Sequence, residues 1–536
     1  MSDTFPIPGL ELPAEAGESR RGPSTDELLA GLNEPQRAAV VHAGAPLLVV
    51  AGAGSGKTRV LTRRIAWLVA ERKAHPGSIL AITFTNKAAA EMKERVEELV
   101  GRRARIMWVS TFHSACVRIL RKEIDRLGFK SSFSIYDAAD SKRLMTLVLK
   151  DLDLDPRRYQ PGAVLNWVSD QKNELRDVDE ATLDARNNFE ETCAAAYAAY
   201  QRRLREANAL DFDDLIMTAV HLFATYPEVR ETYRRRFRHV LVDEYQDTNH
   251  AQYALVHQLC ADNPEGDTLL DAESADNRAP AAELMVVGDA DQSIYAFRGA
   301  NIRNILDFEQ DFPNATSILL EQNYRSTQTI LTAANSVIGH NKSRKPKKLW
   351  SDAGDGERIV GYVADDEHDE ARFVPEEIDT LVDGGGRAGD VAVFYRTNAQ
   401  SRVFEEVFIR TGQPYKVVGG VRFYERREVR DALAYLRMLN NPDDQVSLRR
   451  ILNTPKRGIG DRAVACVGLL AERDGLTFWE ALRRADQAPG LATRSLTNIK
   501  GFVAIVEELQ SMVEAGERAD VILESVLARS GYLAEL

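Results

Sequence analysis

The sequence contains few cysteines, and their spacing does not suit a cross-linked or zinc-bound fold. Its 536 residues include four cysteines, which lie far apart with no C-x-x-C pair. Disulfide frameworks and zinc ribbons use closely spaced cysteines, so this pattern disfavours both. A reducing compartment fits it better, and we expect a cytoplasmic protein.

Long hydrophobic runs are also missing. No apolar stretch reaches the roughly 18 residues that a membrane-spanning helix needs. The N-terminus lacks the charged region and apolar core of a signal peptide. We therefore expect no membrane partner, and we predict that residues 1–25 form a disordered leader.

The sequence also has no excess of positive charge. The chain carries 69 lysines and arginines against 81 acidic residues, which gives a formal net charge of −12 at pH 7. A dedicated nucleic-acid binder is often basic, so any such function has to be argued from local sites. The length exceeds what one hydrophobic core supports, so several domains are expected.

Short apolar runs that end in polar residues recur along the chain. They include "LLVV" before the glycine-rich stretch, "HVLVDEYQDT", "LMVVGDADQS" and "TSILLEQNY". Buried strands with polar residues just past their carboxyl ends are typical of a parallel α/β sheet, where ligands bind at that edge. The predicted fold class is α/β, with two cores that each carry a mainly helical insertion.

These patterns also predict domain boundaries. The first core is assigned to residues 26–114 and 236–300, interrupted by a helical insertion at 115–235. The second core is assigned to residues 301–418, with "VAVFYRTNAQSR" as one of its strands, and a second helical insertion to 419–536.

The stretch "AGAGSGKT" predicts a nucleotide site. It departs from G-x-x-x-x-G-K-[ST] only by an alanine in the first glycine position. Its glycines allow backbone N–H groups to converge on phosphate oxygens. Lys57 is expected to contact the β and γ phosphates of ATP, and the Thr58 hydroxyl to ligate Mg²⁺. The loop residues assigned to ATP are Gly52, Ala53, Gly54, Ser55, Gly56, Lys57 and Thr58.

Polar residues after the later apolar runs complete this site. Asp243 and Glu244 end one run, where the first carboxylate can hold Mg²⁺ and the second can polarise the attacking water. Gln292 follows another run as a candidate γ-phosphate sensor, and Arg325 follows a third as a cation for transition-state charge. Gln36, upstream of the loop, is a candidate for reading adenine.

The ordered set of motifs resembles the UvrD/Rep/PcrA group of superfamily 1 DNA helicases, most closely the UvrD type. The matching stretches include "LNEPQRAAV", "AGAGSGKT", "ITFTNKAAAEM", "STFHS", "DFDDL", "VDEYQDTN", "VGDADQSIYAFRGA", "NYRS", "YRTNAQSR" and "GGVRFYERREVRDALAY". The resemblance implies two RecA-like motor domains with ATP and Mg²⁺ between them. It implies 3′–5′ translocation on single-stranded DNA and duplex unwinding in DNA repair or replication.

Roles for individual residues follow from the resemblance. Gln36 would contact adenine, while Arg59 and Tyr324 would pack around the base. Gln292 would couple the γ-phosphate to the DNA site, and Arg325 would reach the nucleotide from the second motor domain. The implied partners are single-stranded DNA, single-strand/duplex junctions and repair proteins, with the oligomeric state left open.

Aromatic residues give single-strand binding a physical basis. Phe84, Tyr295 and Phe297 follow strand ends, and an aromatic face that stacks on a base contributes about 1–3 kcal/mol. Tyr295 and Phe297 are two residues apart and would share a face of a strand. The residues implied to contact the DNA backbone are Thr83, Asn86, His113, Arg298 and Asn398.

Three further stretches have plainer alternatives. Gly458 and Gly460 in "NTPKRGIGDRA" can present N–H groups to a phosphate of duplex DNA, or simply form a turn between helices. "NKSRKPKKL" is read as a solvated face or linker. In "DFDDL", Asp211 or Asp213 is expected to cap a helix.

Two later motifs of the family, "T-x-H-x-x-K-G-L-E" and "V-x-x-T-R-A", do not occur in the sequence. We therefore expect the second motor domain to be incomplete and this chain alone to be at best a weak ATPase. The alternative function is an ATP-gated module that binds single-stranded DNA without unwinding duplex.

Overall fold

The computed structural model describes residues 24–261, 279–341, 344–418 and 426–535. The predicted leader, residues 1–25, lies outside this part except for Ser24 and Thr25, which cap and begin helix α1 (Thr25–Leu29). The chain divides into two compact units. Unit 1 comprises Met1–Ser131, Val148–Ala199 and Leu210–Gly354, and unit 2 comprises Ser132–Leu147, Tyr200–Ala209 and Asp355–Leu536.

Unit 1 is built on a six-stranded parallel sheet with the strand order β3-β2-β6-β7-β1-β8. Every residue of β1 and β2 is buried, which explains their uninterrupted apolar runs. The predicted parallel α/β architecture is confirmed. The strands are β1 (Leu47–Ala51), β2 (Ile79–Thr83), β3 (Trp108–Thr111), β6 (His239–Val242), β7 (Glu283–Gly288) and β8 (Thr316–Leu320).

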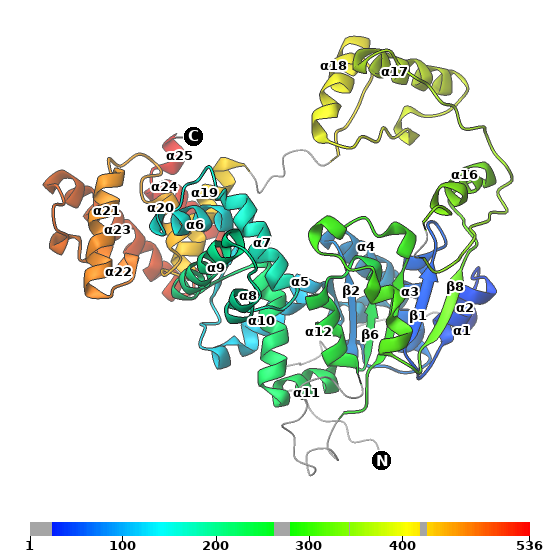
Figure 1. Ribbon diagram of the computed structural model, residues 1–536, viewed down its shortest axis with the longest axis horizontal. Coiled ribbons are helices and arrows are strands. Elements are labelled where there is room, and N and C mark those ends of the chain that lie inside the picture. Colours follow the sequence, from blue (N-terminus) through cyan, green and yellow to red (C-terminus); the bar gives the residue numbers. More distant parts are fainter. Residues whose placement is uncertain (1–23, 262–278, 342–343, 419–425, 536) are drawn as a thin grey trace. The chain divides into compact units, whose positions relative to one another are not determined.

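Helices pack against this sheet (Figure 1). Helix α3 (Lys57–Ala70) buries Val60, Leu61 and Ile65 in the same core as β1 and β7. The other α-helices that the structure describes through residue 338 are α2 (Glu34–Val41), α4 (Asn86–Val100), α5 (Phe112–Glu123), α6 (Ala138–Asp151), α7 (Pro161–Asn173), α8 (Val178–Leu183), α9 (Asn188–Glu206), α10 (Phe212–Thr225), α11 (Pro227–Arg236), α12 (His250–Cys260), α14 (Arg303–Leu306), α15 (Phe308–Asp311) and α16 (Gln328–Ile338).

Helices α5 to α11 dominate the predicted helical insertion, with only the short strands β4 (Ser134–Tyr136) and β5 (Ala209–Asp211) among them. Asp211 caps α10 through a capping box, as expected for "DFDDL". The carboxylates of Asp211 and Asp214 also form ion pairs with the fully buried Lys172, at 2.7 and 2.8 Å. This buried cluster anchors α10 to α7.

Two predictions about the second core need correction. Strand β8 pairs in parallel with β1, so the first sheet extends beyond the boundary that we placed at residue 300. The stretch "VAVFYRTNAQSR" forms no strand: residues 391–395 lack regular structure and Phe394 is 92% exposed. A strand needs a neighbour to satisfy its backbone N–H and C=O groups, and none pairs with these residues in the described part of the chain.

Unit 2 is mainly helical in its described residues, although Ser132–Leu147 contains β4. It contains α17 (Glu367–Asp383), α18 (Ser401–Thr411), α19 (Arg427–Asn440), α20 (Gln445–Ile451), α21 (Asp461–Asp474), α22 (Phe478–Arg483), α23 (Thr493–Glu514), α24 (Ala519–Arg529) and α25 (Tyr532–Glu535). The helices from α19 onward share a core that includes Tyr435, Ile499 and Phe502. This agrees with the helical pattern predicted after Gly419, although residues 419–425 lie outside the description. No helix in the described ranges is long and apolar enough to span a membrane.

Glu283, at the start of β7, lies among three basic side chains. It accepts hydrogen bonds from Arg72 at 2.8 Å and Arg64 at 3.3 Å, and His239 lies 3.5 Å away. Although burial opposes ionisation, the bonds from His239 and Arg72 hold the pKa of Glu283 at about 2. The ionised carboxylate therefore stabilises the fold at every pH above the ordinary glutamate value.

We expect Glu283→Gln to lower the free energy of unfolding by about 1–2 kcal/mol at neutral pH, since solvent screens part of this network. The folded-state pKa lies below the unfolded value, so the contribution is complete above about pH 4.5 and fades toward about pH 2. Urea unfolding across this range should show the difference between wild type and variant shrinking as the pH falls. A difference that stays constant would contradict the assignment.

Candidate functional site

The predicted site residues of unit 1 gather at the carboxyl edge of the sheet. The loops after β1, β6, β7 and β8 carry the nucleotide candidates, and those after β2, β3 and β7 carry the candidates for single-stranded DNA. In the strand order, β3 and β2, whose loops carry only DNA candidates, lie on one side, and β1 and β8, whose loops carry only nucleotide candidates, lie on the other. Strands β6 and β7 lie between these two pairs. The loop after β7 thus belongs to both sets.

The glycine-rich loop connects β1 to α3 in a conformation that side chains would obstruct. Gly54 and Gly56 have φ values of 66° and 87°, which favour glycine. A Cβ on Gly52 would lie 2.1 Å from Leu349 Cδ2, so the loop is packed on its outer side as well. The loop ends at the N-terminus of the 14-residue helix α3, where backbone N–H groups favour an anion.

Lys57, at the start of α3, forms an ion pair with Glu244. Lys57 Nζ donates to Glu244 Oε2 at 2.6 Å. Glu244 has a φ of 49°, an unusual value for a side-chain-bearing residue that marks a constrained position. Burial and the neighbouring Glu244 raise the pKa of Asp243 to about 7. The two carboxylates after β6 therefore face the phosphate-binding loop.

The donor set at this position fits Mg²⁺. Asp243 is 7% exposed, and its carboxylate and the Thr58 hydroxyl are hard oxygen donors. Magnesium is commonly held by one or two such groups together with substrate phosphates. No cluster of three or more potential metal-binding side chains occurs among the residues that the structure describes.

Gln36 contacts the glycine-rich loop directly. Its Nε2 donates to the Ser55 carbonyl at 2.8 Å, and its Oε1 accepts from the Asn33 N–H at 3.1 Å. The side chain is fully buried and braces the loop. Contact with adenine stays a prediction; each of these atoms keeps one further hydrogen-bonding position. The exposed Arg59 lies one turn into α3.

The loop after β8 also touches the glycine-rich loop. The Tyr324 N–H donates to the Gly54 carbonyl at 2.9 Å, and Asn323 Nδ2 donates to the Ala53 carbonyl at 2.6 Å. Asn323 Oδ1 accepts from the N–H of Arg325 at 2.8 Å, which leaves the exposed arginine beside the loop. Sequence reasoning missed Asn323, because the partner of its Nδ2, the Ala53 carbonyl, lies 270 residues away.

Gln292 follows β7 in a short 3-10 turn, Ala290–Gln292. Its Nε2 donates to Asp289 Oδ2 at 2.5 Å. The nearby Gln246, which is 1% exposed, connects this turn to Glu244: its Nε2 lies 3.0 Å from Glu244 Oε2 and its Oε1 accepts from the Asp289 N–H at 2.9 Å. Gln246 was not predicted as a site residue from the sequence, although it lies inside "DEYQDT".

An aromatic cluster forms beside the nucleotide residues. The rings of Phe84 and Tyr295 stack at 5.2 Å, and Tyr295 and Phe297 lie 6.1 Å apart at an interplanar angle of 39°. The guanidinium of Arg298 lies over both Tyr295 and Phe297. Phe297 is 74% exposed, so its face is open to a base. Residues 296–298 form a 3-10 turn, so Tyr295 and Phe297 do not share the face of a strand.

The remaining DNA candidates of unit 1 differ in exposure. Asn86 is exposed at the start of α4, but Thr83 is 1% exposed at the end of β2. We expected the Thr83 side chain at the surface, but it is buried. The last residue of a central strand is covered from both sides. His113 lies edge-on to Phe212 at 5.8 Å, and burial lowers its pKa. Phe212, 48% exposed, was read only as part of a capping motif.

Unit 2 carries three of the DNA candidates, Asn398, Gly458 and Gly460. Asn398 is exposed in the turn Asn398–Gln400. Gly458 has a φ of 73°, and Gly460 is the N-cap of the 14-residue helix α21. Between them, the Ile459 N–H already donates to Asn453 Oδ1 at 3.2 Å. The loop therefore has both the turn between helices and a helix N-terminus.

Comparison with known proteins identifies the family. Residues 32–313 match the model of the UvrD/REP helicase N-terminal domain, and residues 318–486 match the UvrD-like helicase C-terminal domain. These matches agree with the predicted pair of RecA-like motor domains. Over 523 residues, 96% of this chain, the sequence is 60% identical to the ATP-dependent DNA helicase UvrD1 of Mycobacterium bovis.

A second relative, the ATP-dependent DNA helicase PcrA of Bacillus subtilis, is 49% identical over 509 residues, 95% of this chain. In both cases the chain covers 66% of the relative's length. The matched N-terminal model alone spans more than half of the sequence. The chain therefore belongs to the UvrD/REP helicase family.

Proposed function

We propose that this protein is an ATP-dependent DNA helicase that moves along single-stranded DNA. The observation that carries the proposal is the loop after β7, which holds both Gln292, beside the nucleotide residues, and the exposed aromatic cluster. A change at the phosphate side of this short loop has to pass only a few residues to reach bases stacked on Tyr295 and Phe297.

ATP would bind to the glycine-rich loop with its phosphates at the N-terminus of α3. Lys57 would then exchange its partner Glu244 for a phosphate oxygen, which frees Glu244 to accept a proton from water. Bound Mg²⁺, held by Thr58 and Asp243, would offset phosphate charge. Arg325 would add positive charge near the transferred phosphoryl group.

Single-stranded DNA would lie along the aromatic cluster. Phe84, Tyr295 and Phe297 supply stacking faces, and Arg298 and Asn86 supply polar contacts near the backbone. His113 and Phe212 extend this surface beyond β3. Thr83 is left out, because its side chain is buried.

Finer features rest on the family resemblance. They include 3′–5′ polarity, a role in repair or replication, and a cytoplasmic location. Gly458 and Gly460 would present N–H groups to duplex DNA at a junction, with Asn398 on the single strand. The second candidate function is ATP-gated binding of single-stranded DNA without unwinding, which the same loop after β7 supports equally well.

Strand displacement separates these candidates. A labelled duplex with a 3′ single-stranded tail, mixed with the 536-residue chain and ATP·Mg²⁺, should yield free strand, while a 5′-tailed duplex should yield much less. ATP-dependent binding to both substrates without displacement would favour the gated module. DNA binding that does not depend on ATP would contradict both candidate functions.

A further inference from the structure

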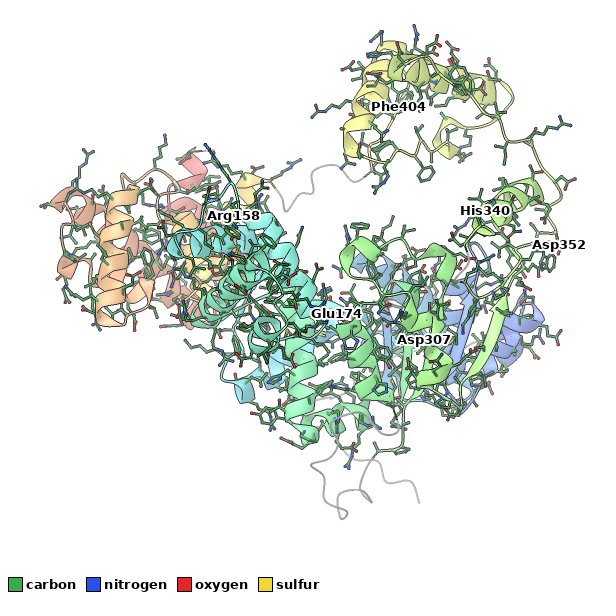
Figure 2. The ribbon with its side chains drawn as sticks, in the orientation of Figure 1. Arg158, Glu174, Asp307, His340, Asp352 and Phe404 are labelled. Carbon is green, nitrogen blue, oxygen red and sulfur yellow. The ribbon has the colours of Figure 1, made fainter. Side chains whose placement is uncertain are left out.

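The basic run "NKSRKPKKL" is not a solvated linker in its described part. After α16, residues 344–349 form a segment that we call the basic strap, which Figure 2 shows between the labelled His340 and Asp352. Asn335 of α16 fixes the strap by two hydrogen bonds to the backbone of Leu349, at 2.8 and 3.2 Å. The expectation of a solvated run fails at Lys347, which is buried with a buried partner, Asp289.

The strap pairs with the carboxylates that precede Gln292. Lys347 Nζ contacts both Asp289 and Asp291, and Arg344 binds Asp291 through two bonds of 2.9 and 2.6 Å. The side chains of Lys347 and Asp289 are each only 2% exposed. Two cations thus balance two carboxylates in a site that water barely reaches, where loss of one charge leaves the other uncompensated.

Asp289 transmits this contact to Gln292. One carboxylate oxygen accepts from Lys347 and from the Asp291 N–H at 3.0 Å, while the other accepts from Gln292 Nε2 at 2.5 Å. The Gln292 amide nitrogen carries two hydrogens, so one remains available to a phosphate oxygen. A carboxylate that is held in place therefore orients the carboxamide before any ligand binds.

The same strap also reaches the glycine-rich loop. Leu349, two residues after Lys347, is the side chain on which a Cβ at Gly52 would collide. Alternate residues of an extended segment project to the same side, so Lys347 and Leu349 contact the sensor turn and the phosphate loop together. The strap begins at α16, which follows Arg325 in sequence.

We propose that Lys347 is a positioning residue for ATP hydrolysis: it fixes Asp289, and through Asp289 it preorganises the Gln292 carboxamide for the γ-phosphate. This inference rests on the proposed ATPase function. It assigns a role to a lysine whose side-chain partners are Asp289 and Asp291, and it makes the strap part of the sensing machinery.

The first test compares Lys347→Met, Lys347→Arg and the matched control Lys348→Met, whose parent residue is exposed. With saturating single-stranded DNA, we expect Lys347→Met to lower kcat about 10-fold with KM for ATP changed by less than about 3-fold, because preorganisation acts in the transition state. Lys347→Arg should recover most of the rate, and Lys348→Met should match wild type. Melting temperatures check that each variant is folded.

A double-mutant cycle shows whether Lys347 acts through Gln292. In a Gln292→Ala background, Lys347→Met should lower kcat by less than about 2-fold, because the group that it positions is gone. A full 10-fold loss in that background would overturn the proposal, since Lys347 would then act by another route.

Binding gives a readout that needs no turnover. Calorimetry with AMP-PNP·Mg²⁺ and ADP·Mg²⁺ measures how strongly each variant senses the γ-phosphate. We expect Lys347→Met to reduce the preference for AMP-PNP about 3-fold or more relative to wild type, and Gln292→Ala to do the same. If the preference for AMP-PNP fell in Gln292→Ala but stayed unchanged in Lys347→Met, the role of Lys347 would be overturned and the proposed function would stand. A wild-type chain that binds neither nucleotide would overturn the proposed function, and this inference with it.

Discussion

Glu244→Gln is expected to reduce ATP turnover by about 10²–10⁴-fold, the range for loss of a positioned general base. Glutamine keeps the size and hydrogen-bonding reach of glutamate but cannot accept the proton from water. It also removes the charge that pairs with Lys57 at 2.6 Å. Lys57 then no longer has to leave a carboxylate when phosphates bind, so ATP should bind as tightly as in wild type or more tightly.

The measurement is steady-state ATP turnover together with the affinity for AMP-PNP·Mg²⁺. The matched control is Glu507→Gln, which removes a surface ion pair with Arg483 in unit 2. This control should retain the wild-type rate. If Glu244→Gln retained most of the turnover, Glu244 could not be the base, and the assignment of the loop after β6 would be wrong.

Phe297→Ala is expected to weaken binding of single-stranded DNA by about 5- to 100-fold, which corresponds to the loss of one stacked base. Its ring is 74% exposed, so the substitution removes little packing and should leave the melting temperature nearly unchanged. Fluorescence anisotropy with a labelled oligonucleotide measures the loss. Tyr295→Ala should weaken binding as well, because its ring lies between Phe84 and Phe297.

The control for this series is Phe189→Ala. Phe189 is also exposed, at 38%, and stacks on Tyr159, and neither residue is among the DNA candidates. Loss of this ring should not change DNA affinity. Equal losses for Phe189→Ala and Phe297→Ala would show that the aromatic cluster has no special role in binding.

The sequence was sufficient for the features that depend on short-range patterns. The glycine-rich loop, the carboxylates after β6 and the parallel sheet all follow from runs of adjacent residues, and the structure has them in the expected places. Parallel strands place their carboxyl ends at one edge, so the order of motifs already indicated that Lys57 and Glu244 would meet.

Features that depend on long-range pairing were not predictable. Lys347 lies 58 residues from Asp289 in sequence, and nothing in "NKSRKPKKL" indicates that one lysine is buried while its neighbour is exposed. The predictions about β8 and about residues 391–395 failed for the same reason, since a strand depends on its neighbours: β8 pairs with β1, and residues 391–395 stay unpaired. The burial of Thr83 likewise follows from the strands on either side of β2.

The measurement that tests the account most directly is ATP turnover by the 536-residue chain with and without single-stranded DNA, beside Glu244→Gln. The shared loop after β7 predicts that DNA raises the turnover and that the stimulated rate disappears in the variant while both ligands still bind. Turnover that does not respond to DNA, or that survives in Glu244→Gln, would contradict the coupling of the two sites. No turnover by a chain that binds both ligands would agree with the weak ATPase expected from the two missing motifs and would favour the ATP-gated binding module for this chain.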